Sequence, residues 1–309
     1  MSRDMLANAT VSTTVREDAL SRVPVPALAP VIAAAFAIGQ PLLAHLIGIL
    51  RWDQCFCGGA EAGWGLGLAA VLWYTAISVP AGLLIARRLI GRPARVRPSE
   101  FVSGIVPAAL GALLATPVVA TLARSAVVPG VDYPGLTAGF GVPVGAAIGV
   151  LAAGAALASA AVIRGLVASW LWVWSVGLVA AVLLLLAESG GPQPLGGVDV
   201  AFADGRVADG LLRAMSDVGW LIALVAPAVA AAFVAYRSVR SGSGAAAAML
   251  GGAAGALLIV AAYRGRGDVP TGYEPWYALA IAEFALSAVA AVAAALFARV
   301  RFPVRGPAG

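Results

Sequence analysis

Long, uninterrupted apolar stretches constrain this chain more than any other feature. A helix needs about 20 mostly apolar residues to cross the hydrocarbon core of a bilayer, which is about 30 Å thick. Because lipid offers the backbone no hydrogen-bond partners, continuous runs of this kind predict helices rather than open strands. We therefore expect an all-α, polytopic integral membrane helix bundle of about eight transmembrane helices. The predicted spans are residues 27–50, 64–86, 101–123, 139–161, 166–187, 218–236, 244–263 and 276–298.

Composition excludes a soluble protein of this length. Mean hydropathy is +0.94 and only 11% of the residues are charged, against about 25% in soluble domains. We expect one transmembrane domain over 23–301, with an outer loop at 188–217, a disordered cytoplasmic tail at 1–22 and a short cytoplasmic tail at 302–309. The only charge between 135 and 187 is Arg164, so a turn at Arg164–Gly165 is predicted between the fourth and fifth spans. Six spans are the alternative.

The charges predict the orientation. The net charge is +5, every basic residue is an arginine, and alternate loops hold more than twice as many arginines on one side as on the other. Since positive residues stay in the cytoplasm, both termini are expected on the cytoplasmic side. The membrane is expected to be the inner membrane of the cell. The second loop has an arginine cluster that we expect to contact anionic lipid at the cytoplasmic face; the alternatives are a topology signal alone or a docking segment for a partner. Its members are Arg87, Arg88, Arg92, Arg95 and Arg97. Without a soluble domain beside this cluster, no nucleic-acid partner is expected.

Small residues recur every four positions on two spans. Gly141, Gly145 and Gly149 lie on the fourth, and Gly251 and Gly255 on the seventh. Such spacing lets helix backbones approach closely. We expect packing within the chain, with a homo-oligomer interface or a partner subunit as the alternative.

Polar residues inside the spans are the strongest candidates for a functional site, because ionisable groups are costly in lipid. His45 and Glu283 lie at matching depth on the first and eighth spans. Gln40 is deeper than His45, and Ser287 is one helical turn below Glu283. The sequence predicts a pocket of these four residues that opens to the outer side and binds a substrate or a proton. The alternative is a hydrogen-bonded pair that only fixes helix packing.

The outer loops hold further candidates. Cys55 and Cys57, the only cysteines, face a compartment that permits disulfides; they form a local disulfide, remain two thiols, or take part in redox or metal chemistry. Asp53 and Glu61 are the acids best suited to catalysis in the same region. In the fifth loop, a strand at 198–202, a turn at Asp204–Gly205 and a short amphipathic helix at 207–215 predict a cap or a lid over the outer helix ends.

Several chemistries are excluded. One histidine cannot form a His-Glu-x-x-His zinc site, and without lysine there is no P-loop. We predict no metal site, no cofactor and no assigned catalytic residue. The leading function is a transport-type permease or the membrane subunit of a larger complex. The alternatives are a membrane-embedded enzyme acting on a lipid-linked substrate at the outer face, and a scaffold or assembly factor without a ligand.

Overall fold

The computed structural model of the chain describes residues 24–57, 61–91, 98–187, 209–265 and 274–302. Within these ranges the protein is helical without a strand, which confirms the all-α prediction; one isolated parallel bridge joins Cys55 to Val127. The two predicted tails (except Phe302), the strand at 198–202 and the turn at Asp204–Gly205 lie outside the described residues. The helices are α2 (Val25–Leu46), α3 (Glu61–Leu89), α4 (Pro98–Leu113), α5 (Thr116–Leu122), α6 (Pro134–Ala158), α7 (Ala160–Ala187), α8 (Asp209–Arg240), α9 (Ala245–Gly265) and α10 (Glu274–Arg301).

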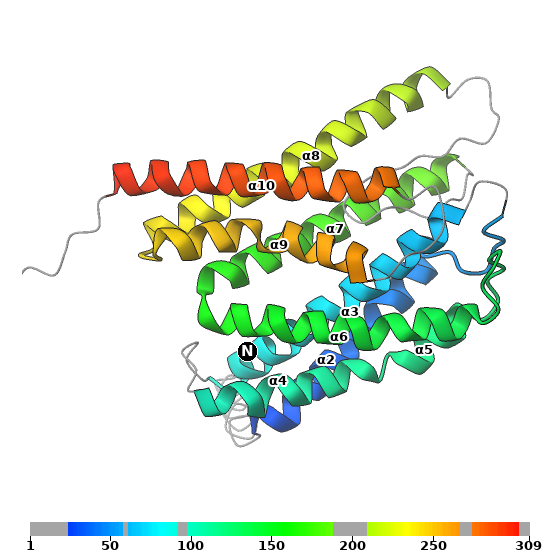
Figure 1. Cartoon of the computed structure of the whole chain (residues 1–309), viewed down its shortest axis with the longest axis horizontal. Helices are drawn as coiled ribbons and strands as arrows, with labels where there is room; N and C mark the ends of the chain where they lie inside the picture. The colour runs from blue at the N-terminus through cyan, green and yellow to red at the C-terminus, as the bar shows by residue number, and fades with distance from the viewer. Residues whose placement is uncertain (1–23, 58–60, 92–97, 188–208, 266–273, 303–309) are drawn as a thin grey trace, which may run out of the picture.

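The helices run along one direction of the bundle and alternate in sense (Figure 1). By length and composition, seven segments of the described chain can cross a membrane: α2, α3, the α4–α5 segment, α6, α7, α9 and α10. The remaining predicted span, 218–236, lies within α8, which returns from the end where α7 finishes to the end where α9 begins (Figure 1). The chain is therefore a multi-pass membrane protein.

The third predicted span is broken, which the sequence analysis did not anticipate. Its residues form α4 and the short α5, with a turn at Leu114–Ala115 between them. Pro117 lies in the first turn of α5. Because proline has no backbone N–H, it cannot continue the hydrogen-bond ladder of α4, and a new helix begins around it.

The predicted turn at Arg164–Gly165 is wrong. The chain turns at Ser159, whose backbone is extended (φ −148°, ψ 120°), and whose Oγ accepts a hydrogen bond from the N–H of Ala161 at 3.2 Å. Ser159 is thus the N-cap of α7, the role that serine favours. Arg164 lies in the second turn of α7 and donates hydrogen bonds to the hydroxyls of Ser238 and Ser241, at 3.0 and 2.9 Å. The single charge in this apolar stretch, Arg164, therefore makes hydrogen bonds between α7 and the end of α8 and does not mark a turn.

The predicted short helix at 207–215 is not separate. From Asp209 onward its residues are the first turns of α8, a helix of 32 residues. This correction lengthens the sixth span.

Glycines set the closest helix contacts, as expected for packing within the chain. A Cβ on Gly145 or Gly149 would lie 2.6 Å from the carbonyl oxygen of Leu72 or Ala76, on α3. A Cβ on Gly251 would meet the backbone of Ala161, on α7. Only glycine permits this approach, so α6 lies directly on α3 and α9 on α7.

The helices form two groups. In the first, α2 packs on α3 and α4, and α6 packs on α3, α4 and α5; in the second, α8, α9 and α10 pack on one another and α7 packs on α9. Contacts of α9 with α3 and α6 connect the groups. The large core cluster draws on the first group together with α7 and α9, and a smaller alanine-rich cluster is confined to α8, α9 and α10.

Candidate functional site

A small cavity lies where the four helices of the second group meet. Glu283 and Ser287 contribute from successive turns of α10, and Ser169 and Trp172 from successive turns of α7. Its volume is about 30 Å³. A cavity of about 10–15 Å³ already holds one water molecule when polar groups surround it, so this one has room for a water or a small ion and is far too small for an organic substrate.

The polar groups around this cavity are buried without partners. Glu283 is 3% exposed and Ser287 1% exposed. Within the described ranges, Ser169 Oγ, Ser287 Oγ and Trp172 Nε1 have no hydrogen-bond partner. Leaving buried polar atoms unpaired costs about 1–3 kcal/mol each. Three such atoms lie around one cavity that the buried Glu283 also lines, and this combination makes the cavity the candidate binding site.

The local sequence explains how these helices enclose a polar space. Gly252 and Gly255 line the cavity from α9, and a Cβ on Gly255 would collide with Ser169. Pro227 lines it from α8; because it lacks an N–H, the Ala223 carbonyl one turn earlier loses its helical donor. Close glycine packing therefore narrows the cavity.

The structure divides the four residues of the predicted pocket. Glu283 and Ser287 share the cavity, whereas Gln40 and His45 belong to α2, which packs in the first group. Equal depth placed His45 and Glu283 together in the sequence analysis, but equal depth does not make two helices neighbours.

Gln40 is the centre of a separate, satisfied cluster. Its Nε2 donates to the Ser78 hydroxyl at 3.1 Å and to the Tyr74 carbonyl at 3.3 Å. Its Oε1 accepts from the indole N–H groups of Trp170 and Trp174, at 3.0 and 3.1 Å. All hydrogen-bonding positions of the amide are used, so the Gln40 cluster joins α2, α3 and α7 and has no capacity left for a ligand.

His45 lies in the last turn of α2. Its Nδ1 is 2.9 Å from the Leu50 carbonyl oxygen; since a carbonyl only accepts, Nδ1 is the donor of this hydrogen bond. A second cavity of about 720 Å³, the His45 cavity, is lined by His45, Arg51 and Asp53 and also by Leu178 and Val182 of α7. The cavity combines charged and apolar walls.

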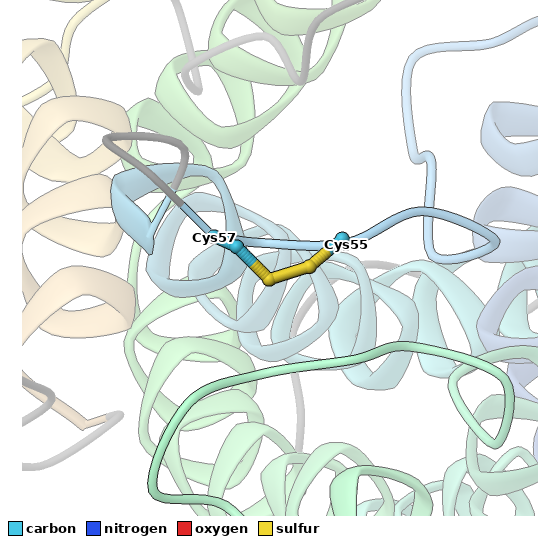
Figure 2. Close-up of a disulfide and its surroundings, with 2 residues drawn as sticks. All are labelled: Cys55 and Cys57. Carbon is cyan, nitrogen blue, oxygen red and sulfur yellow. A yellow bond between two sulfur atoms is a disulfide. The ribbon is translucent and has the colours of Figure 1, made fainter.

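The loop between α2 and α3 contains a disulfide between Cys55 and Cys57, whose Cα atoms are 5.3 Å apart (Figure 2). Phe56 between them is buried, donates its N–H to the Val127 carbonyl at 2.8 Å, and packs edge-on against Trp64 at 5.6 Å. Of the three alternatives for the cysteines, the structure has the local disulfide. Both cysteines and Asp53 are exposed.

The remaining candidates are placed only in part. Glu61 is the first residue of α3, and its side chain lies outside the described set. Arg87 and Arg88 belong to the last turn of α3, where Arg87 is buried and Arg88 exposed. Arg92, Arg95 and Arg97 lie outside the described residues. Across the described part of the chain, no group of three or more His, Cys, Asp or Glu residues is arranged to hold a metal ion.

Sequence reasoning missed Ser169 and Trp172. Neither is ionisable, and their contribution depends on which face of α7 meets α10. The available signal was the pair Gly251 and Gly255, because a close α7–α9 contact brings this face of α7 towards α10. In comparisons with known proteins, no family model, no curated protein and no solved structure matches the chain.

Proposed function

We propose that this protein is a transport-type permease of the inner membrane, acting alone or as the membrane subunit of a larger complex, with Glu283 as its proton-binding group. One observation supports this above all others: the buried Glu283 lines a small cavity inside the bundle, together with three polar atoms that have no hydrogen-bond partner in the described part of the chain, Ser169 Oγ, Ser287 Oγ and Trp172 Nε1. Intramembrane carboxyl groups that face the interior of a bundle are typical of proton and ion pathways.

The size and chemistry of the cavity favour a proton. An ionised carboxylate without a cationic partner is costly to bury, and binding a proton removes its charge. The Trp172 N–H only donates, so it suits a carboxyl oxygen or a water better than a bare metal cation. The two serine hydroxyls both donate and accept, and they complete a short route for a proton around Glu283. A conformational change that exposes the cavity to either side would then move one proton per cycle.

The test needs no knowledge of the transported substrate. The full chain is reconstituted into proteoliposomes on a solid-supported membrane, and the transient current after a stepwise change of external pH is recorded. The wild type is expected to give a charge movement from proton binding. Glu283→Gln, which keeps the size of the side chain, is expected to abolish it.

Glu274→Gln is the matched control, because it removes a carboxyl at the first position of α10, nine residues from Glu283. It is expected to retain the wild-type current. An unchanged current in Glu283→Gln, or an equal loss in both variants, contradicts the proposal. A current that requires Na⁺ at constant pH reassigns the site to a cation.

The His45 cavity supports a second candidate function, an enzyme acting on a lipid-linked substrate at the outer face of the membrane. His45 and Asp53, two side-chain types that general acid–base chemistry uses, line this cavity together with Arg51 and with the apolar Leu178 and Val182 of α7. Asp53→Asn is expected to abolish turnover of a lipid-linked phosphate or glycan added to the proteoliposomes. If turnover persists in this variant, the His45 cavity is not the catalytic site.

A further inference from the structure

An apolar groove runs along the outside of the bundle between α2, α3 and α7. Its volume is about 320 Å³. Phe36 of α2 lines it, together with one face of α3 between Ile77 and Arg88 and one face of α7 between Ile163 and Trp170. Although α2 packs closely on α3, α7 does not pack closely on either of them. The groove is the space left between this helix pair and α7.

The end of the groove at Ile77 and Trp170, which we call the deep end, is closed by polar contacts that are already satisfied. The Trp170 N–H donates to Gln40 Oε1 at 3.0 Å, so Trp170 offers the groove only its ring. The Gln40 cluster therefore bridges α2 and α7 at this level and stops the groove from continuing across the bundle. No polar ligand group would find a partner at this depth.

The length of the groove matches one leaflet of a bilayer. Along α3 it extends from Ile77 to Arg88, which at 1.5 Å per residue is about 17 Å. Half of the hydrocarbon core is about 15 Å. An extended acyl chain lying along α3 would thus run from the bilayer centre to the level of the headgroups.

The shallow end of the groove is positively charged. Arg88 is exposed in the last turn of α3, and none of the other residues lining the groove is charged. Its planar guanidinium forms paired hydrogen bonds with a phosphate. The end of α3, the start of α7 and the end of α8 lie at the same end of the bundle (Figure 1). Arg164 lies near the start of α7, and Arg237 and Arg240 lie in the last turn of α8, so the local field attracts anionic headgroups.

We propose that this groove binds one anionic phospholipid, with an acyl chain between α3 and α7 and the phosphate on Arg88. The groove is apolar, extends over about one leaflet and has the positive charge of Arg88 at its headgroup end. These properties are complementary to an anionic phospholipid. A zwitterionic phospholipid would fill the slot equally well but would gain less from Arg88. This site is independent of the Glu283 cavity and of the function proposed for it.

The test measures retained lipid on the purified full chain. The protein is exchanged into detergent, incubated with equal amounts of phosphatidylglycerol and phosphatidylcholine of the same acyl chains, and examined by native mass spectrometry. The wild type is expected to retain one phosphatidylglycerol in preference to phosphatidylcholine. Arg88→Gln is expected to weaken retention of phosphatidylglycerol about fivefold, the effect of one basic residue near a headgroup, and to leave phosphatidylcholine unchanged.

Two controls separate the groove from general surface charge and from misfolding. Arg240→Gln removes an exposed arginine from α8, at the same end but outside the groove, and is expected to behave as wild type. Ala81→Phe fills the groove and is expected to reduce retention of both lipids, whereas Ala35→Phe, on an exposed position of α2, is not. Equal losses in Arg88→Gln and Arg240→Gln, or full retention in Ala81→Phe with an unchanged melting temperature, overturn the proposal.

Discussion

Two polar clusters lie inside the bundle, and they differ in whether their hydrogen bonds are made. Around Gln40, the side-chain amide has four partners and holds α2, α3 and α7 together. Around Glu283, three neighbouring polar atoms have no partner among the described residues. Satisfied polar groups in a membrane protein stabilise its architecture, whereas unpaired polar atoms beside a cavity and an intramembrane carboxyl point to a bound proton, ion or water. Stability measurements can test this distinction separately from activity.

The largest expected effect comes from closing the Glu283 cavity. Gly255→Val would drive its side chain into Ser169 and towards the carbonyl oxygen of Gly165, which lies 3.1 Å from the position of an added Cβ. Overpacking of this kind costs about 3 kcal/mol at the upper end of its usual range. Reversible unfolding in mixed detergent micelles measures the change. Gly39→Val is the control, because no atom lies within 4 Å of its added Cβ; equal stability of the two variants would show that the α7–α9 contact is not close.

Removing the centre of the satisfied cluster has the next largest effect. Gln40→Leu eliminates four hydrogen bonds and leaves the N–H groups of Trp170 and Trp174 unpaired. Interhelical hydrogen bonds in membranes contribute about 0.6 kcal/mol each, so the expected loss is about 2 kcal/mol. Trp174→Phe removes one of the four bonds and should cost about a quarter as much in the same assay. A Gln40→Leu protein as stable as wild type would mean that these bonds do not hold the helices together.

The smallest effects come from two serines that differ only in their partners. Ser78 Oγ accepts from Gln40 and donates to the Tyr74 carbonyl at 2.6 Å, so Ser78→Ala should cost about 1 kcal/mol. Ser287 Oγ is equally buried but has no partner among the described residues. Ser287→Ala removes this unpaired hydroxyl and should therefore raise the free energy of unfolding by about 1 kcal/mol. The difference between the two unfolding free energies is the measurement. Equal costs would contradict the division into satisfied and unsatisfied clusters.

The sequence predicts the helices well but their breaks poorly. Whether a segment forms a membrane span depends on its length and its apolar content. Both are local properties of the sequence, and the all-α prediction was correct for that reason. The breaks depend on single residues: Pro117 divides the third span, and Ser159 caps α7. The turn at Arg164–Gly165 failed because a lone arginine at the end of a bundle can bond across to serines of another helix instead of marking a loop.

The candidate site was predictable only along one helix. Glu283 and Ser287 are four residues apart, so their shared face follows from helical periodicity. The contributions of Ser169 and Trp172 depend on how α7, α9 and α10 are rotated about their axes, which periodicity in uniformly apolar helices does not determine. Gln40 and His45 were grouped with Glu283 by their expected depth in the membrane. Depth does not determine which helices are neighbours in the bundle.

The single-residue link at Ser159 limits how the bundle can rearrange. Because α6 ends at Ala158 and α7 begins at Ala160, neither helix can slide along the other without unwinding. A rotation of α7 about Ser159 would move Ser169 and Trp172, which lie about 14 and 18 Å along α7, and would change the width of the cavity that they line.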